Sequence, residues 1–162
     1  MEQYKIVYDA LDQMGVAYQV AEHPPVMTAE EADRYIEGMP GVRTKTLFLC
    51  NKKGTEHYLV VLDDSKRVDM KQLAELLGEK GLRFASSQRL MDKLSLYPGA
   101  VSLFGLINNR EKDVKVCLDR EMLSEDQVTF HPNDNTRTLF LSTEDMLRFL
   151  RESGYEYRLI DL

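Results

Sequence analysis

The chain has 162 residues, of which 43% are hydrophobic and 30% are charged, and its formal net charge is −6. This length suits one compact domain, residues 1–162, and the composition excludes a disordered or repetitive polymer. The negative net charge argues against a general nucleic-acid binder held by phosphate attraction alone.

The first third of the chain predicts two helices with a strand between them. Residues 2–14 place apolar side chains at helical spacing and end at Gly15, which suits a helix C-cap. Residues 17–21 form an apolar run before the His23-Pro24-Pro25 break and are typical of a strand. Thr28-Ala29-Glu30-Glu31 has the form of a capping box, so a second helix should start there and run toward Glu37.

The rest of the chain alternates between strand and helix patterns. Two apolar runs, 44–50 and 57–62, flank the turn sequence 51–54 and predict a hairpin at the centre of a sheet. The remaining predictions are helices over 68–77, 86–93 and 142–152, strands over 82–85, 114–118, 127–130, 138–141 and 155–159, and a loop over 100–109. Residues 132–135 have turn chemistry and join the runs 127–130 and 138–141 into a second hairpin-like pair. Two such pairs among helices favour an α+β fold with a mixed, largely antiparallel β-sheet surrounded by helices.

The compartment and metal content follow from what the sequence lacks. No apolar run approaches the roughly 20 residues of a membrane-spanning helix, and the start has no basic region followed by an apolar core. We therefore expect a cytoplasmic protein without membrane contact. Cys50 and Cys117 lie in separate apolar runs and are expected to be buried thiols. The three histidines are scattered, so we expect no metal.

Charge is unevenly distributed along the chain. Residues 1–42 carry 2 basic and 8 acidic side chains, residues 43–93 carry 11 and 7, and residues 94–162 carry 8 and 12. The basic middle third is the candidate surface for phosphate, although such side chains can equally be solvating turns. The candidate tRNA-binding residues are Lys52, Lys53, Lys66, Arg67, Arg83 and Arg89.

Polar residues beside glycine breaks are the candidates for chemistry, since the nucleophile elbow, the P-loop and the dinucleotide fingerprint are all missing from the sequence. Arg43 and Lys45 enter a strand, residues 99–109 form a glycine-containing loop, and His131 opens a polar segment that contains Asn133. Each feature also has an ordinary interpretation, such as a surface lysine or a hydrogen-bonded structural histidine.

Three ordered blocks together resemble the YbaK/prolyl-tRNA synthetase-associated editing family, in particular its free-standing alanyl-tRNA(Pro) deacylase (PrdX-like) branch. The blocks are Arg43-Thr44-Lys45-Thr46-Leu47-Phe48-Leu49, residues 98–108 and Phe130-His131-Pro132-Asn133-Asp134-Asn135-Thr136. The resemblance covers nearly the whole chain. It implies a mixed sheet, a pocket for the aminoacylated 3′ end of a tRNA, and no cofactor.

The resemblance also implies roles for particular residues. Lys45 is expected to hold the terminal nucleotide or its phosphate, Gly99 to bring backbone amides near the scissile carbonyl, and His131 to bind the amino group or position water. The vicinal ribose hydroxyl is expected to assist, so we predict no covalent intermediate. The remaining substrate-binding candidates are Arg43, Thr46, Ala100, Val101, Ser102, Leu103, Phe104, Gly105 and Asn133.

Two departures from the family pattern leave the preferred amino acid open. Thr46 stands where the deacylases usually have asparagine, and Leu103 stands where they commonly have proline. Alanine is the first choice, with serine and cysteine as alternatives, because small changes in a pocket give only about 1–3 kcal/mol of discrimination. The expected partners are aminoacylated tRNA, with proline tRNA as the expected carrier, and prolyl-tRNA synthetase through a transient contact. The chain itself is expected to be a monomer or a weak homodimer.

Two non-enzymatic interpretations also remain open. A protein of the same fold could bind aminoacyl-tRNA or a free amino acid as a sensor or regulator without turnover. An interaction module with a coincidentally similar pocket would tolerate replacement of Lys45 and His131.

Overall fold

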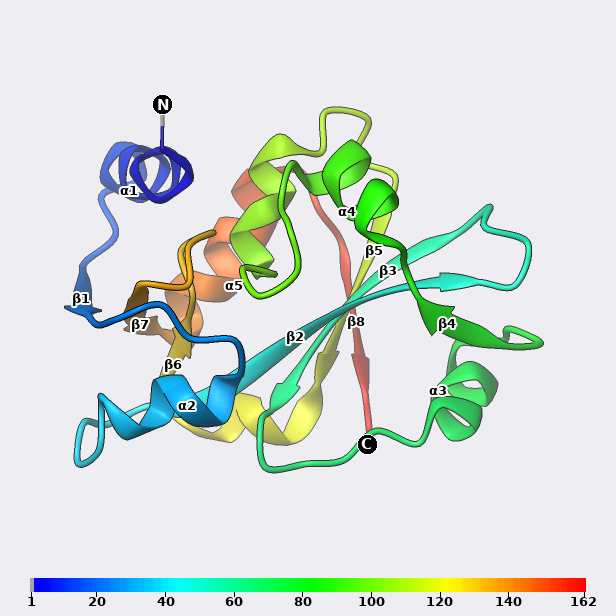
Figure 1. Ribbon diagram of the computed structural model, residues 1–162, viewed down its shortest axis with the longest axis horizontal. Coiled ribbons are helices and arrows are strands. Elements are labelled where there is room, and N and C mark those ends of the chain that lie inside the picture. Colours follow the sequence, from blue (N-terminus) through cyan, green and yellow to red (C-terminus); the bar gives the residue numbers. More distant parts are fainter. Residues whose placement is uncertain (1) are drawn as a thin grey trace.

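The computed structural model describes residues 2–162, which form a mixed sheet with helices on both faces (Figure 1). The strands are β1 Tyr18–Glu22, β2 Val42–Asn51, β3 His57–Asp63, β4 Leu82–Phe84, β5 Val114–Asp119, β6 Gln127–Phe130, β7 Arg137–Ser142 and β8 Tyr157–Ile160. The helices are α1 Gln3–Gln13, α2 Ala29–Arg34, α3 Met70–Leu77, α4 Ser87–Leu94 and α5 Thr143–Glu152, with two 3-10 helices, η1 Leu103–Asn108 and η2 Arg120–Ser124. The predicted α+β class is confirmed.

The strand order is β1-β7-β6-β2-β3-β5-β8, with β4 paired to β2. Both predicted hairpins, β2–β3 and β6–β7, are antiparallel, as are β1–β7 and β2–β4. The pairings β2–β6, β3–β5 and β5–β8 are parallel. β2 therefore lies at the centre of the sheet, as expected, and runs through the middle of the molecule in Figure 1.

The sheet is covered on both faces, and this explains the continuous apolar run of β3. Leu59 and Val61 pack into the larger hydrophobic cluster with side chains of α4, η1 and α5. Tyr58, Val60 and Leu62 face the other cluster, which includes Leu73 of α3. A strand buried on both faces carries apolar residues at consecutive positions rather than at alternate ones.

Local capping chemistry fixes most helix starts. The Thr28 hydroxyl accepts from the Glu31 N–H at 3.1 Å, so the predicted cap of α2 is confirmed. Asp69 and Ser142 cap α3 and α5 in the same way. α2 ends at Arg34, earlier than predicted, and the chain continues through turns to Gly38. The predicted loop over 100–109 contains the short helix η1.

Candidate active site

A pocket of about 360 Å³ lies at a gap in the sheet beside β2. β6 pairs with β2 only at Val42 and Arg43, and β4 pairs with it only over 49–51, so the stretch between them has no strand partner on that edge. The lining residues are Met27, Thr28, Ala29, Thr44, Lys45, Thr46, Leu47, Phe84, Gly99, Val101, Phe130 and His131. The fold thus brings Lys45, Gly99 and His131, from three separate sequence blocks, to one pocket.

Lys45 reaches the pocket from β2 and is half-buried. Its ammonium donates a hydrogen bond to the backbone carbonyl of Lys66. An ammonium has three N–H donors, so two remain for an anionic ligand. The lysine is therefore held by the protein and still able to bind a phosphate oxygen.

His131 follows β6 and is oriented by a backbone contact. Its Nδ1 lies 3.1 Å from the carbonyl oxygen of Arg137. Because a carbonyl only accepts, Nδ1 carries the proton and Nε2 is the acceptor of the neutral ring. Burial lowers the pKa of His131 below its usual value, and the neighbouring His23 acts in the same direction. The ring is therefore neutral at pH 7 and offers a base.

Gly99 supplies a backbone conformation that other residues rarely adopt. Its φ is +95°, and a Cβ built there would lie 3.3 Å from the terminal carbon of Met27. A side chain at this position would be strained and would press on the pocket wall. The glycine therefore allows the loop to approach the segment before α2 closely.

Sequence reasoning missed several pocket residues. Met27, Thr28 and Ala29 line it from the start of α2, and Phe84 lines it from β4. Met27 is 67% exposed and Phe84 is 62% exposed, so both present apolar surface at the pocket. Phe84 belongs to no recognisable sequence motif, and it reaches the pocket only because β4 pairs with β2.

Arg43 does not line the pocket. Its guanidinium donates to the carbonyls of Ile36, Met39 and Gly41 at 2.8, 2.7 and 3.0 Å. It also lies 5.9 Å from the centre of the Phe140 ring. The side chain expected to bind substrate instead ties the chain after α2 to the start of β2.

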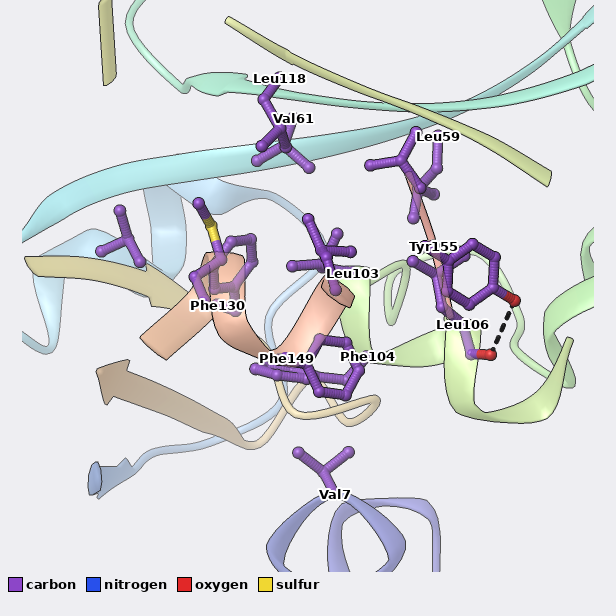
Figure 2. Close-up of a cluster of buried hydrophobic side chains, with 14 of the residues drawn as sticks. Val7, Leu59, Val61, Leu103, Phe104, Leu106, Leu118, Phe130, Phe149 and Tyr155 are labelled. Atoms are coloured by element: carbon purple, nitrogen blue, oxygen red, sulfur yellow. Dashed lines mark hydrogen bonds between the residues drawn. The ribbon is translucent and has the colours of Figure 1, made fainter. Parts of the chain in front are cut away.

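Most of the predicted substrate loop is core. Figure 2 shows Leu103 and Phe104 among the buried side chains, and the Phe104 ring lies 5.0 Å from that of Phe149. Ala100, Ser102 and Gly105 are also buried, and the Ser102 hydroxyl caps η1 by accepting from the Phe104 N–H. Gly99 and Val101 are the loop residues that line the pocket.

Asn133 also lies away from the pocket lining. It is 2% exposed, and its amide nitrogen lies 3.4 Å from the side-chain oxygen of Gln3 in α1. Its φ of +60° places it in the left-handed region that asparagine tolerates. These contacts fit a residue that shapes the β6–β7 turn.

The six candidate tRNA-binding residues separate into two groups. Lys52 and Lys53 are exposed at the β2–β3 turn, and Arg83 is exposed on β4, opposite Cys50. Arg89 joins this end, where it donates to the Gly54 carbonyl at 2.9 Å.

Lys66 and Arg67 lie at the other end of β3. The Lys66 ammonium is 2.7 Å from Asp119 and 2.5 Å from Glu121. These carboxylates raise the pKa of Lys66 through hydrogen bonds. Since its charge is already paired, Lys66 is a poor phosphate ligand, whereas Arg67 is exposed.

Two carboxyl groups meet where α2 packs beside the loop after β3. Burial, followed by hydrogen bonding with Asp64, raises the pKa of Asp33 to about 8. One side-chain oxygen of Asp64 is buried and has no hydrogen-bond partner among the described residues. The Asp33 carboxyl therefore holds its proton to a much higher pH than an exposed aspartate does.

A cavity of about 460 Å³ lies elsewhere, beside β5 and β8. Its cations already have partners: Lys112 donates to the Ser153 carbonyl, Lys115 lies 3.1 Å from Glu56, and Arg158 donates to the Leu76 carbonyl. This cavity is not lined by Lys45, Gly99 or His131. The pocket at the sheet gap is therefore the better candidate.

Among residues 2–162, no group of three histidine, cysteine or acidic side chains is placed to hold a metal ion. Cys50 and Cys117 are free and buried, as predicted, and burial raises the pKa of the Cys117 thiol to about 11. Within the same part of the chain, no helix is both long enough and apolar enough to cross a membrane.

Known proteins resemble this chain over most of its length. The sequence model of the aminoacyl-tRNA editing domain matches residues 23–149. The prolyl-tRNA editing protein ProX of Acetoanaerobium sticklandii is 38% identical over 163 residues, covering 100% of this chain and 99% of that protein. Prolyl-tRNA synthetase associated domain-containing protein 1 of Bos taurus is 33% identical, covering 88% of this chain and 85% of its own.

A solved structure described as a candidate trans-editing enzyme for prolyl-tRNA synthetase superimposes with a TM-score of 0.75. It covers 100% of this chain and 97% of its own at 21% sequence identity. At that identity the likeness concerns the fold.

Proposed function

The chain belongs to the aminoacyl-tRNA editing domain family, and on that premise we propose that it removes alanine from mischarged proline tRNA in trans. The family activity is hydrolysis of the ester bond in a mischarged aminoacyl-tRNA. Beyond this family activity, we propose that the amino acid is alanine, that the tRNA is proline tRNA, that particular pocket residues act on the ester, and that the protein works in the cytoplasm. We further propose that residues 1–162 act as one editing domain.

The observation that carries the proposal is the convergence of Lys45, Gly99 and His131 on one pocket of about 360 Å³. The pocket is small and is lined by threonines, apolar side chains and one neutral histidine. A small amino acid suits such a site. The relative from Acetoanaerobium sticklandii, whose name describes prolyl-tRNA editing, supports proline tRNA as the carrier.

Each residue has a distinct proposed role. Lys45 binds a phosphate of the 3′-terminal nucleotide and fixes the ester before reaction. His131 accepts through Nε2, either from the attacking water or from the substrate amino group. An aminoacyl ester is already activated, so water can attack its carbonyl carbon directly; the bond to the ribose oxygen then breaks and that oxygen takes a proton.

The acceptor stem is proposed to follow the end of the sheet that carries Lys52, Lys53 and Arg83. These side chains are exposed, and β4 connects them to the pocket through Phe84. Binding there should weaken as salt is added, because phosphate contacts release counterions. A transient contact with prolyl-tRNA synthetase would deliver the substrate.

The proposal is tested by the release of amino acid from alanyl-tRNA(Pro), seryl-tRNA and prolyl-tRNA(Pro) with catalytic amounts of protein. We expect multiple turnovers on the alanyl ester and sparing of the prolyl ester. Lys45→Ala should lower kcat/KM by about 100-fold, since misplacing a substrate can cost that much. Lys71→Ala, on the exposed face of α3, should not lower it. A fully active and folded Lys45→Ala protein would overturn the role of this lysine.

Failure of the protein to hydrolyse any of the three esters would favour the sensor interpretation. In that case the protein would bind an aminoacyl-tRNA with an unchanged ester, and Lys45→Ala would weaken binding alone.

A further inference from the structure

The gap beside β2 leaves one edge of this central strand unpaired over part of its length, while the other edge pairs with β3. On the edge away from β3, β6 pairs at Val42 and Arg43, and β4 pairs from Leu49 onward. The Ala85 N–H also reaches the Phe48 carbonyl at 3.0 Å. Thr46 lies midway between these contacts.

The hydrogen bonds at the two ends of the hairpin show which way the Thr46 backbone points. The Arg43 carbonyl accepts from Asp64 at 2.8 Å, and the Asn51 N–H donates to Glu56 at 3.1 Å, so odd-numbered residues of β2 bond toward β3. In an antiparallel pair the N–H and C=O of successive residues point to opposite edges. Both backbone groups of Thr46 therefore point into the gap, as the Phe48 carbonyl points toward β4.

These two groups lie at the pocket and are available to a ligand. Thr46 is half-buried and lines the pocket together with Gly99 and His131. Among residues 2–162, no strand residue pairs with the edge of Thr46 that faces the gap. By contrast, the amide of Ala100, in the loop expected to supply donors, is already bonded to the Tyr97 carbonyl at 3.1 Å.

An aminoacyl ester carries a donor and an acceptor in the arrangement that a strand residue presents. Its α-ammonium and its carbonyl oxygen flank one Cα, as the N–H and C=O of a residue do. We propose that the aminoacyl group docks on β2 as a missing strand residue, with Thr46 N–H donating to the ester carbonyl and Thr46 C=O accepting from the ammonium. This inference deepens the proposed function and rests on it.

The pairing would act on the reaction as well as on binding. When water adds to the carbonyl carbon, negative charge develops on the oxygen that Thr46 N–H contacts, and a fixed donor there stabilises the transition state. The contact uses the backbone, so it does not depend on which side chain occupies position 46. It is therefore available with the threonine that this chain carries at position 46.

The test replaces the Thr46 amide by an ester, which removes the N–H alone. Thr46→Val is the reference, and α-hydroxyisovaleric acid at position 46 is its backbone counterpart. Because both proteins carry the same side chain, kcat on alanyl-tRNA(Pro) is compared between them, and any effect of losing the Thr46 hydroxyl is common to both. The ester form should lose about 100-fold or more, as removal of one oxyanion donor does.

A matched control uses the same hydroxy acid at Val60, which is opposite Leu47 in the β2–β3 ladder. That ester removes a ladder hydrogen bond and should lower stability while leaving kcat unchanged.

The ammonium contact is tested with lactyl-tRNA(Pro), in which a neutral hydroxyl replaces the α-ammonium. The KM for this substrate should rise about tenfold, since charge-assisted hydrogen bonds are roughly twice as strong as neutral ones.

The outcomes separate the two proposals. A wild-type protein that does not hydrolyse alanyl-tRNA(Pro) would overturn the proposed function, and the inference with it. If the wild-type protein is active and the ester form at position 46 keeps the kcat of Thr46→Val, the inference alone is overturned. An unchanged KM for the lactyl ester would overturn the ammonium contact.

Discussion

Replacing Arg43 by methionine distinguishes a structural arginine from a substrate-binding one. The guanidinium donates to three carbonyls at 2.7–3.0 Å, all in the segment that follows α2. Hydrogen bonds to charged groups contribute about 1.5–3 kcal/mol each. Arg43 remains partly exposed and the three bonds are not additive, so we expect a loss of about 2–3 kcal/mol in the free energy of unfolding.

That loss should appear as a lower melting temperature. For a chain of this size, 1 kcal/mol corresponds to about 2–4 °C, so Tm should fall by about 4–12 °C. The assay is thermal and urea unfolding of Arg43→Met beside Arg34→Met. Arg34 is an exposed arginine at the end of α2, and its replacement should change stability by about 0.5 kcal/mol or less.

Activity completes the comparison. At a temperature where both variants are folded, Arg43→Met should keep KM for alanyl-tRNA(Pro) within a few-fold of wild type, since Arg43 does not line the pocket. An unchanged Tm with a KM raised tenfold would refute the reasoning and return Arg43 to the substrate site.

Three further predictions concern titration and charge. The lowered pKa of His131 keeps the folded ring neutral, so stability should fall as pH drops below about 6.5, and kcat/KM should fall at a lower pH; His131→Gln should abolish that acid limb. The raised pKa of Asp33 means that its contribution to stability is complete below the ordinary pKa of about 4 and is lost progressively as pH rises to about 8; urea unfolding between pH 4 and 8 should show this loss in wild type and not in Asp33→Asn. Lys66→Met leaves the Asp119 carboxylate, 1% exposed, without its cation, and should cost about 3 kcal/mol of stability while tRNA affinity at fixed salt stays unchanged; weaker tRNA binding by a stable variant would contradict the ion-pair role.

Helix caps and apolar periodicity were readable from the sequence because they depend on residues a few positions apart. The Thr28 cap, the β2–β3 hairpin and the amphipathic α5 follow from such local patterns. The predicted end of α2 was wrong. After Arg34 the chain continues in turns, and the guanidinium of Arg43, seven residues beyond Ile36, binds the Ile36 carbonyl, a contact that no local pattern in the sequence indicates.

The roles of charged and polar side chains were less predictable, since a charge in the sequence does not show its partner. Lys66 looks like Lys52 in the sequence, yet one is paired with Asp119 and the other is exposed. Leu103 and Phe104 follow a glycine that reaches the pocket, yet their side chains turn into the core.

The sequence by itself determined the elements of the fold and the three blocks that hold Lys45, Gly99 and His131. Only the tertiary structure decided that these blocks meet at a gap in the sheet. The gap exists because β6 and β4 pair with the two ends of one edge of β2 and stop short of its middle. The β2–β4 pairs join residues more than 30 positions apart, and the β2–β6 pairs join residues more than 80 positions apart. The number of residues that pair depends on long-range packing, which no local sequence pattern indicates.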